Sequence, residues 1–296
     1  MSRLLPFALG LFLLGHRTVL ACAMCSCGDP TLTATGVEKP YRNRLRLGLE
    51  ERGGWYEQGE GEARRTFGTL KSTLTIAWSP GERATLALVL PWSTTWVSPI
   101  GKSQQFVSGL GDLETSVRLV LLRDQAFSPR HLFWLTAALA IPTAPRLRDD
   151  SGHPYPDDDQ PGSGGFSPAL GATYGWFGDH LSAFTSMSYR LTSGGPRGYR
   201  RGTSLGFLAA LQHQPVAWSA LQLGLTGVWA EPDSLANGSA LPNTGGTLVS
   251  LAPALLVAPI PQLLVRLGAE IPALQFLTGT QHQGLQLLLS LAYDIH

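Results

Sequence analysis

The sequence has few charged residues, only three cysteines, and no apolar run long enough to cross a bilayer as a helix. Charged side chains make up 15% of its 296 residues, whereas soluble domains contain about 25%. The 22 Lys and Arg nearly balance the 21 Asp and Glu, so the net charge is +1, and a basic surface for nucleic acid is lacking. No later stretch reaches about 18 apolar residues, which excludes helical spans. These absences suit neither a soluble enzyme nor a helical membrane protein.

Glycine is abundant, and short alternating segments fill the chain from about residue 41 to its end. The sequence has 34 glycines, which suits a sheet that must bend until it closes. Breaks between the segments are alternately tight and long. The tight ones lie near residues 79–81, 128–129, 178–179, 214–215 and 259, and the long ones at 53–62, 98–107, 143–164, 194–199, 231–245 and 275–282. Alternate connections of an up-and-down sheet lie at opposite ends, so we expect all long loops at one end.

The segments predict about twelve strands with a two-residue period. We place them at residues 41–52, 65–78, 84–96, 111–122, 132–141, 166–177, 181–192, 203–212, 217–230, 247–257, 262–274 and 284–295. In the first, Leu45, Leu47 and Leu49 alternate with Arg44 and Arg46, so one face is apolar and the other polar. The predicted fold is all-β: a closed antiparallel up-and-down transmembrane β-barrel of about twelve strands.

A soluble β-sandwich also alternates and is the competing interpretation. It would bury the apolar rows in a core, whereas a barrel turns them toward lipid. One-sided loop lengths, strands of about ten residues or more, and low charge favour the barrel, because sandwich strands are usually nearer five or six residues.

The first 40 residues read as an export signal followed by a segment without a clear strand. Arg3 precedes an apolar run at residues 4–15, which is too short to span a bilayer as a helix. Cleavage near Ala21 or Ala23 is favoured, and lipidation of Cys22 is the alternative, because residues 19–22 loosely match a lipoprotein signal. We expect a signal peptide at 1–21, a cysteine-bearing periplasmic segment at 22–40 and a barrel at 41–296.

The last predicted strand carries an unbroken alternating row of large side chains. Its members are Leu285, Leu287, Leu289, Leu291, Tyr293 and Ile295, and His296 follows them. The outer-membrane assembly machinery reads such terminal rows in many barrels. An even strand number places both chain ends in the periplasm. The expected location is therefore the bacterial outer membrane, and the expected partners are its lipid and lipopolysaccharide, the assembly machinery and a small-molecule solute.

Three short motifs, in their order, resemble a known family. Gly-Leu-Gly-Asp-Leu-Glu at 109–114 leads into a strand, Leu-Ala-Ile-Pro-Thr at 139–143 precedes a long polar loop, and Gly-Ser-Gly-Gly-Phe at 162–166 precedes Pro-Ala-Leu-Gly at 168–171. This order is similar to that of the outer-membrane β-barrel transporter family related to the meta-pathway of phenol degradation. The resemblance covers most of the chain after residue 41. It implies an exported barrel with a transport or channel role, and it transfers neither functional residues nor a phenol substrate.

Alternate residues of a strand face opposite sides of the sheet, a rule that we call strand parity. It assigns ten charged residues to the barrel interior, because Arg or Lys facing lipid at the midplane costs about 2–4 kcal/mol. They are Arg44, Arg46, Arg65, Lys71, Asp112, Glu114, Arg118, Arg190, Arg266 and Glu270. Two interpretations stay open: a polar pathway for a solute, or a network of ion pairs that fills the bore. About twelve strands leave only a modest bore.

The three cysteines, Cys22, Cys25 and Cys27, lie within six residues of one another, with Met24 among them. Thiolates at this spacing suit copper or zinc, although three thiolates leave a tetrahedral site incomplete. Haem attachment is excluded because Ser26 stands where the motif needs His. The alternatives are processing at Cys22, a disulfide in an oxidising compartment, or thiols without a role.

An acidic loop and four histidines are further candidates. Asp149, Asp150, Asp157, Asp158 and Asp159 with His153 could bind Ca²⁺ or lipopolysaccharide, but their spacing fits no EF-hand, and a solvated loop is favoured. Some twelve-stranded barrels are phospholipases with a Ser–His pair, and His131, His180, His213 and His282 lie near predicted strand ends. None has the sequence context of such a pair, so no enzyme activity is predicted.

The sequence therefore predicts an outer-membrane barrel that passes or binds a small solute. The alternative is a structural or assembly-partner barrel without transport, with a periplasmic copper- or zinc-binding cysteine cluster.

Overall fold

The computed structural model describes residues 43–61, 64–99, 105–125, 129–195 and 198–295, which are built almost entirely from strands. The strands are β1 (Arg44–Gln58), β2 (Arg65–Ser79), β3 (Ala84–Pro99), β4 (Gln105–Leu110), β5 (Leu113–Arg123), β6 (His131–Ile141), β7 (Ser167–Phe177), β8 (Leu181–Arg190), β9 (Ser204–Val216), β10 (Ser219–Ala230), β11 (Gly246–Ile260), β12 (Leu263–Leu277) and β13 (Gln281–Ile295). A short 3₁₀ turn, η4 (Asp157–Asp159), lies between β6 and β7. Within these residues no helix has the length and apolarity needed to cross a membrane.

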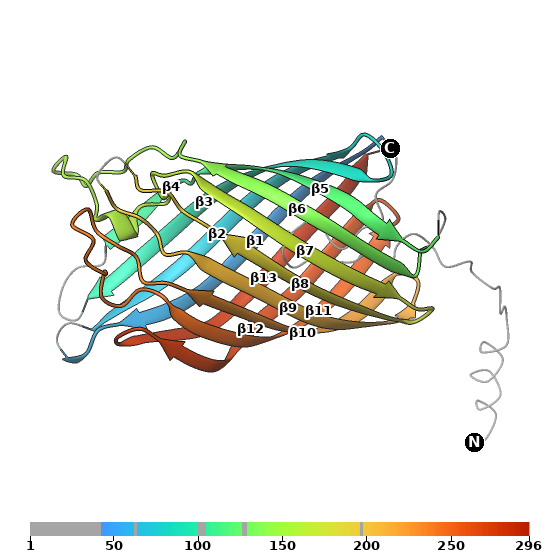
Figure 1. The fold of residues 1–296 in the computed structure, drawn as a ribbon. Coiled ribbons are helices and arrows are strands. Elements are labelled where there is room, and N and C mark those ends of the chain that lie inside the picture. Colours follow the sequence, from blue (N-terminus) through green and yellow to red (C-terminus); the bar gives the residue numbers. More distant parts are fainter. Residues whose placement is uncertain (1–42, 62–63, 100–104, 126–128, 196–197, 296) are drawn as a thin grey trace, which may run out of the picture.

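The sheet closes on itself as an antiparallel barrel of twelve strands (Figure 1). β1 pairs with β2 on one side and with the last strand, β13, on the other. β4 and β5 both pair with β3, at different ends of it, so together they fill one position in the ring. At the break between them, the Gly111 N–H donates to the Pro91 carbonyl at 2.8 Å. The predicted closed barrel is confirmed.

The two faces of the wall have opposite chemistry. On β13, Leu287 and Leu289 are exposed, whereas Leu288 and Ser290 are buried inside. Exposed aromatic side chains lie near the tight-turn end at Trp78, Trp218 and Tyr293, and near the loop end at Trp55, Trp229 and Phe276. Two aromatic girdles around an apolar band are typical of a barrel in a bilayer. A sandwich is excluded, because a closed ring leaves no second sheet to pack against.

Glu51 departs from this pattern. It lies on β1 at an outward-facing position, between the exposed Leu49 and Trp55. Its carboxylate accepts a hydrogen bond of 2.7 Å from the hydroxyl of Ser72, its cross-strand partner on β2. A hydrogen bond offsets part of the cost of removing a polar group from water.

Several strands extend further toward the loop end than the sequence predicts. β1 reaches Gln58 and β12 reaches Leu277, so the long loops expected at 53–62 and 275–282 are wrong over most of their length. Gly53 and Gly54, which open the first of these expected loops, lie within β1. Other glycines inside the sheet lie under aromatic rings. A Cβ at Gly284 would lie 2.4 Å from Trp55 Nε1, and one at Gly68 would lie 1.9 Å from Trp96 Nε1. Indole rings therefore cover these glycines, which keeps them inside the sheet.

The long connections share one end of the barrel. Residues 142–166, 191–203 and 231–245 connect strands there, at the left of Figure 1. Residues 80–83, 178–180, 217–218 and 261–262 form short turns at the opposite end. The loop end thus carries most of the irregular chain that can contact a solute or cover the bore.

Candidate functional site in the barrel lumen

An apolar cluster fills part of the lumen near the tight-turn end. Its members lie on β5 through β9: Val120, Leu132, Trp134, Phe177, Phe184, Leu208 and Ala210. The guanidinium carbon of Arg118 lies 5.7 Å from the Trp134 ring centroid, which is a cation–π contact. Gln212 and Gln222 face each other across β9 and β10. Their buried amide nitrogens have no hydrogen-bond partner among the residues described, so polar groups remain available beside the cluster.

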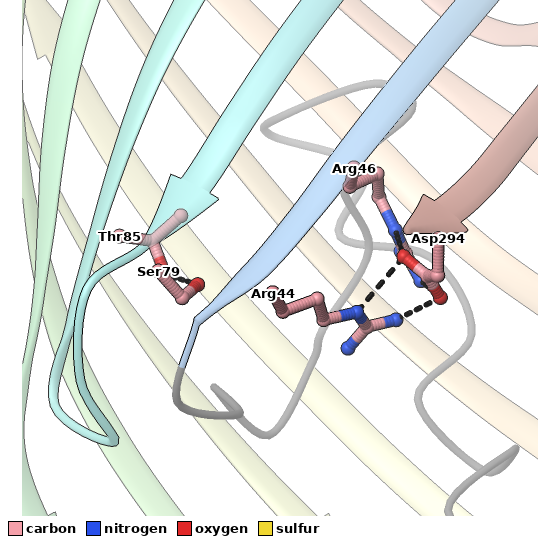
Figure 2. A network of polar contacts seen from close by, with 5 residues as sticks. All are labelled: Arg44, Arg46, Ser79, Thr85 and Asp294. Carbon is pink, nitrogen blue, oxygen red and sulfur yellow. Dashed lines mark hydrogen bonds and ion pairs between the residues drawn. The ribbon is translucent and has the colours of Figure 1, made fainter. Parts of the chain in front are cut away.

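Arg44 and Arg46 of β1 both bind the carboxylate of Asp294 on β13 (Figure 2). Arg46 donates from Nε and Nη2 at 2.6 Å each, and Arg44 donates from Nε at 2.8 Å and also from Nη2. None of the three residues is more than 7% exposed. Because the pairing of β1 with β13 closes the ring, these residues form a seam triad that joins its two ends.

Seven charged residues form a charge belt across the lumen nearer the loop end. Its members are Glu50, Arg52, Lys71, Glu114, Arg190, Arg201 and Glu270. Arg52 Nη1 donates to Glu270 Oε1 at 2.7 Å, across the intervening β13. Arg190 Nη2 donates to Glu114 Oε2 at 2.8 Å, although β6 and β7 separate their strands. Ion pairs that skip strands form on the concave side of the wall, so these groups face the lumen.

Lys71 is the exposed cation of the charge belt. It lies opposite Arg52 in the β1–β2 register, and it is within electrostatic reach of Glu50, Glu114 and Arg201. Its side chain is exposed although its strand position faces inward, so it projects into open space in the lumen. Within the described part of the chain, Lys71 forms no ion pair, whereas Arg52 and Arg190 both do.

A recess with a volume of about 180 Å³ adjoins the Glu114–Arg190 ion pair. Small and hydroxyl-bearing residues line most of it: Thr136, Ala138, Ala169, Gly171, Thr173, Ser188, Ser204 and Gly206. A cavity of about 150 Å³ is large enough to hold benzene. The recess therefore has room for one ring-sized group next to an ion pair.

Asp112 holds the connection 142–166 at the loop end. It lies at the break between β4 and β5, where Oδ1 accepts the Ala144 N–H at 3.2 Å. Its Oδ2 accepts the N–H of Ser163 at 2.6 Å and the hydroxyl of Ser163 at 2.8 Å. Both ends of the connection are thereby fixed to the wall. A second cavity of about 280 Å³ lies here, with Arg146, Asp157, Gln160, Ser163 and Tyr199 among its lining residues.

Neighbouring loops are tied to this connection and to each other. Arg201 Nη2 donates to the Gln160 carbonyl at 3.2 Å. The Tyr199 hydroxyl donates to Asp233 Oδ2 at 2.5 Å, and burial, together with this hydrogen bond, raises the pKa of Tyr199. The Gly202 N–H donates to Asp233 Oδ1 at 2.8 Å. The three loops therefore form one linked rim above the charge belt.

The ten residues that parity assigned to the interior lie in several settings. Four belong to the charge belt (Lys71, Glu114, Arg190 and Glu270), two to the seam triad (Arg44 and Arg46), and Arg118 contacts Trp134. Arg266 is buried near Glu50, Arg65 is exposed at the start of β2, and Asp112 holds a loop.

Four residues of the charge belt and the seam triad are not among the ten assigned to the interior from the sequence: Glu50, Arg52, Asp294 and Arg201. Glu50 and Arg52 alternate in step along β1. Arg52 shares its parity with Arg44 and Arg46, and Asp294 lies on the polar side of the terminal row, so strand parity could have found both. Arg201 lies outside the strands, where no periodic signal exists.

The remaining candidate sites have ordinary settings or lie elsewhere. Cys22, Cys25 and Cys27 lie outside the described residues. In the acidic loop, Asp149 Oδ1 accepts backbone N–H groups from Ser151 and His153 at 2.9 and 2.8 Å, and Asp157 pairs with Arg146 at 2.7 Å. Across the residues described, no group of three His, Cys, Asp or Glu side chains could hold a metal.

Among the described residues, His131 and His180 hydrogen-bond to groups other than serine. The Nδ1 atom of His131 lies 2.7 Å from the hydroxyl of Tyr174, and that of His180 lies 3.3 Å from the Gln214 carbonyl. Residues 202–206 match Gly-x-Ser-x-Gly. Ser204, however, begins strand β9 and lines the recess, whereas a nucleophile elbow requires a sharp strand-to-helix turn.

Comparison with solved structures supports the fold. An outer-membrane channel of the COG4313 group from Pseudomonas putida F1 superposes with a TM-score of 0.67 at 16% identity, over 86% of this chain and 96% of that one. The transport unit of the autotransporter AIDA-I from Escherichia coli gives a TM-score of 0.51 at 9% identity, over 93% and 94%. At these identities the similarity shows an outer-membrane barrel fold.

A third similar structure is more distant. The toluene transporter TbuX from Ralstonia pickettii has a TM-score of 0.43 at 10% identity, over 86% of this chain and 90% of that one, which is too low to support an inference. No family model and no curated protein matches this chain.

Proposed function

We propose that the protein is an outer-membrane channel through which a small solute passes along the barrel axis, contacting the charge belt and the adjoining recess. One observation carries the proposal: where Arg52 and Arg190 form ion pairs on the lumen wall, Lys71 is exposed and has no ion pair among the described residues. It lies within electrostatic reach of Glu114, which lines a recess of about 180 Å³. In a bore filled only to stabilise the wall, inward charges should be buried and paired. The arrangement here fits a contact surface for a solute better.

The fold similarity is consistent with this role. The structure with a TM-score of 0.67 is described as an outer-membrane channel, and we extend that role to this chain. We also propose kinship with the barrels related to the meta-pathway of phenol degradation, on the order of the motifs at 109–114, 139–143 and 162–171. The kinship leaves the solute open.

The remaining features belong to the same proposal. Residues 1–21 are a signal peptide, residues 22–40 a periplasmic segment, and residues 41–296 the barrel. Outer-membrane lipid and lipopolysaccharide surround the apolar band, the assembly machinery inserts the barrel, and both termini lie in the periplasm. Copper or zinc binding by Cys22, Cys25 and Cys27 is tested by metal analysis of the mature chain, and equal metal content in a Cys25→Ser/Cys27→Ser variant refutes it.

A pair of variants on β6 tests the passage. Ala138 lines the recess, whereas its neighbour Ala137 is exposed on the outer face. Ala138→Phe should fill the recess and reduce both conductance in planar bilayers and solute-driven swelling of proteoliposomes. Ala137→Phe adds the same side chain on the lipid side and should leave both unchanged.

The two variants also separate the competing functions. Wild-type barrels that insert into bilayers but carry no current and no solute flux would support the structural alternative and refute the channel. Equal conductance in Ala138→Phe and Ala137→Phe would refute the recess as part of the path. Heat-dependent mobility on gels verifies that each variant is folded before its conductance is compared.

A further inference from the structure

We infer that the solute favoured by this lumen is a small organic anion, and that Lys71 is the residue that binds its charged group. The inference rests on the proposed passage of a solute and specifies its chemical class. Among the described residues, the charge belt has four cations against three anions. Buried Arg266, close to Glu50, adds a further cation. The middle of the lumen is therefore net positive.

Lys71 and Arg201 form no ion pair among the described residues, and of the two Lys71 is the more exposed, whereas Arg201 is tied to the Gln160 carbonyl. Arg52 is engaged by Glu270 at 2.7 Å and by Glu50 at 3.6 Å. Arg190 is engaged by Glu114 at 2.8 Å. An anion that approached either arginine would compete with a carboxylate already bound there. At Lys71 it would meet a lumen-facing side chain whose cross-strand partner, Arg52, is also positive.

The position of Lys71 opposite Arg52 gives a physical reason for anion binding. Like charges directly opposite each other on paired strands are destabilising. Two carboxylates form ion pairs with Arg52, whereas Glu50 and Glu114 act on Lys71 only from beyond ion-pair distance within the described residues. An anion held beside Lys71 would remove this repulsion. It would also sit in a narrow bore walled by protein, where an ion pair is screened less than on an open surface.

The recess defines the size of the uncharged part of the solute. Glu114 links the two places, because it lines the recess and lies within electrostatic reach of Lys71. Thr136, Thr173 and Ser188 supply hydroxyls along the wall of the recess. Its volume of about 180 Å³ exceeds the roughly 150 Å³ that suffices for benzene. The recess therefore has room for the ring of a one-ring carboxylate, and Glu114 connects it electrostatically to Lys71.

A cationic solute fits these contacts less well. Glu114 and Glu270 each already accept a charge-assisted hydrogen bond, from Arg190 and Arg52 respectively. A cation would have to displace an arginine while it passed the lumen-facing side chain of Lys71. Charge selectivity in β-barrel channels is set by such lumen-facing side chains, so the belt should favour anions.

Two measurements test the inference with the full-length barrel. The first is the reversal potential in planar bilayers under a KCl gradient, for wild type, Lys71→Gln, Lys71→Glu and the control Arg130→Gln. Arg130 carries the same charge but lies at the tight-turn end, outside the lumen, with its side chain 63% exposed. The second is calorimetric titration of detergent-solubilised protein with benzoate and with its uncharged relative benzyl alcohol.

We expect wild type and Arg130→Gln to prefer chloride, Lys71→Gln to lose most of that preference, and Lys71→Glu to reverse it. Benzoate should bind wild type more tightly than benzyl alcohol does. Lys71→Gln should weaken benzoate binding about tenfold, as expected for the loss of one close charge pair. The same variant should leave benzyl alcohol binding unchanged. Cation preference in wild type, unchanged selectivity in the Lys71 variants, or equal binding of the two probes would overturn the inference. If no current flows, the channel proposal fails, and the titration still decides whether Lys71 binds an anion.

Discussion

Removal of the Asp294 carboxylate, which joins β1 to β13, should lower the free energy of unfolding more than removal of either arginine that it binds. Asp294 accepts four hydrogen bonds from Arg44 and Arg46 while only 7% exposed. Asp294→Asn keeps the size of the side chain but leaves two buried guanidinium groups beside an uncharged amide. Removing one partner of a buried ion pair costs about 3–5 kcal/mol, and the low exposure here leaves little screening by solvent. We expect a loss of that size.

Replacement of either arginine should cost less. Arg44→Gln or Arg46→Gln leaves Asp294 paired with the other guanidinium, so no buried carboxylate loses all of its cations. Each variant loses charge-assisted hydrogen bonds worth about 1.5–3 kcal/mol, and relief of the repulsion between two adjacent cations offsets part of that cost. Asp294→Asn should therefore be the least stable of the three variants, because it leaves two cations without their shared anion, whereas each arginine variant leaves one ion pair in place.

Urea unfolding in detergent micelles, followed by tryptophan fluorescence, measures these differences. The control is Asp179→Asn, because Asp179 lies 3.8 Å from Arg130 with side chains 87% and 63% exposed. An exposed pair is worth at most about 1 kcal/mol, so this control should unfold close to wild type. If Asp294→Asn unfolds within about 1 kcal/mol of wild type, or later than Arg44→Gln, the seam triad does not hold the closure as argued.

Two further predictions concern the connections between strands. Asp112→Asn replaces one of the oxygens that accept from Ala144 and Ser163 with a donor, so limited proteolysis within residues 142–166 should be about fivefold faster. At the opposite end, the backbone N–H of His131 donates to Asp124 Oδ1 at 3.0 Å and holds the pKa of Asp124 below its ordinary value of 3.8. The stabilisation from a depressed carboxyl pKa is complete above the ordinary value and is lost as pH falls through the folded value. The difference in unfolding midpoint between wild type and Asp124→Ala should therefore shrink below about pH 3, and a constant difference would contradict this.

Strand parity explains why so much of the wall could be predicted. The rows around Leu45 and Leu287 and the charges at Arg44 and Arg46 follow a two-residue period that lipid on one side and polar groups on the other require. Twelve strands and an antiparallel closed barrel followed from that period and from the spacing of the breaks, and the structure bears both out.

Contacts between lumen-facing side chains of strands that are not adjacent could not be predicted in the same way. Parity shows that Arg52 and Glu270 face inward, but their 2.7 Å contact joins residues 218 positions apart in sequence. That contact depends on which strands become neighbours when β13 pairs with β1, and on the stagger of the strands around the ring. Glycine misled for a related reason: Gly53 and Gly54 read as the start of a loop, but they lie within β1 and pair with Leu287 and Gln286 of β13, from the far end of the chain.

The break between β4 and β5 connects the architecture of the wall to the loop that Asp112 holds. Among the strands that the structure describes, β4 pairs with β3 alone, and its other edge has no described strand beside it. An uncovered edge is a site for unwanted pairing, and proteins commonly cover such an edge with a loop. The connection 142–166 supplies this cover: Leu147 lies over Gly109, where a Cβ would be 3.0 Å from its Cδ1, and the Tyr155 hydroxyl donates to the Phe106 carbonyl at 3.5 Å. Because Asp112 fixes both ends of that connection, its carboxylate protects the edge of β4 as well as shaping the outer cavity.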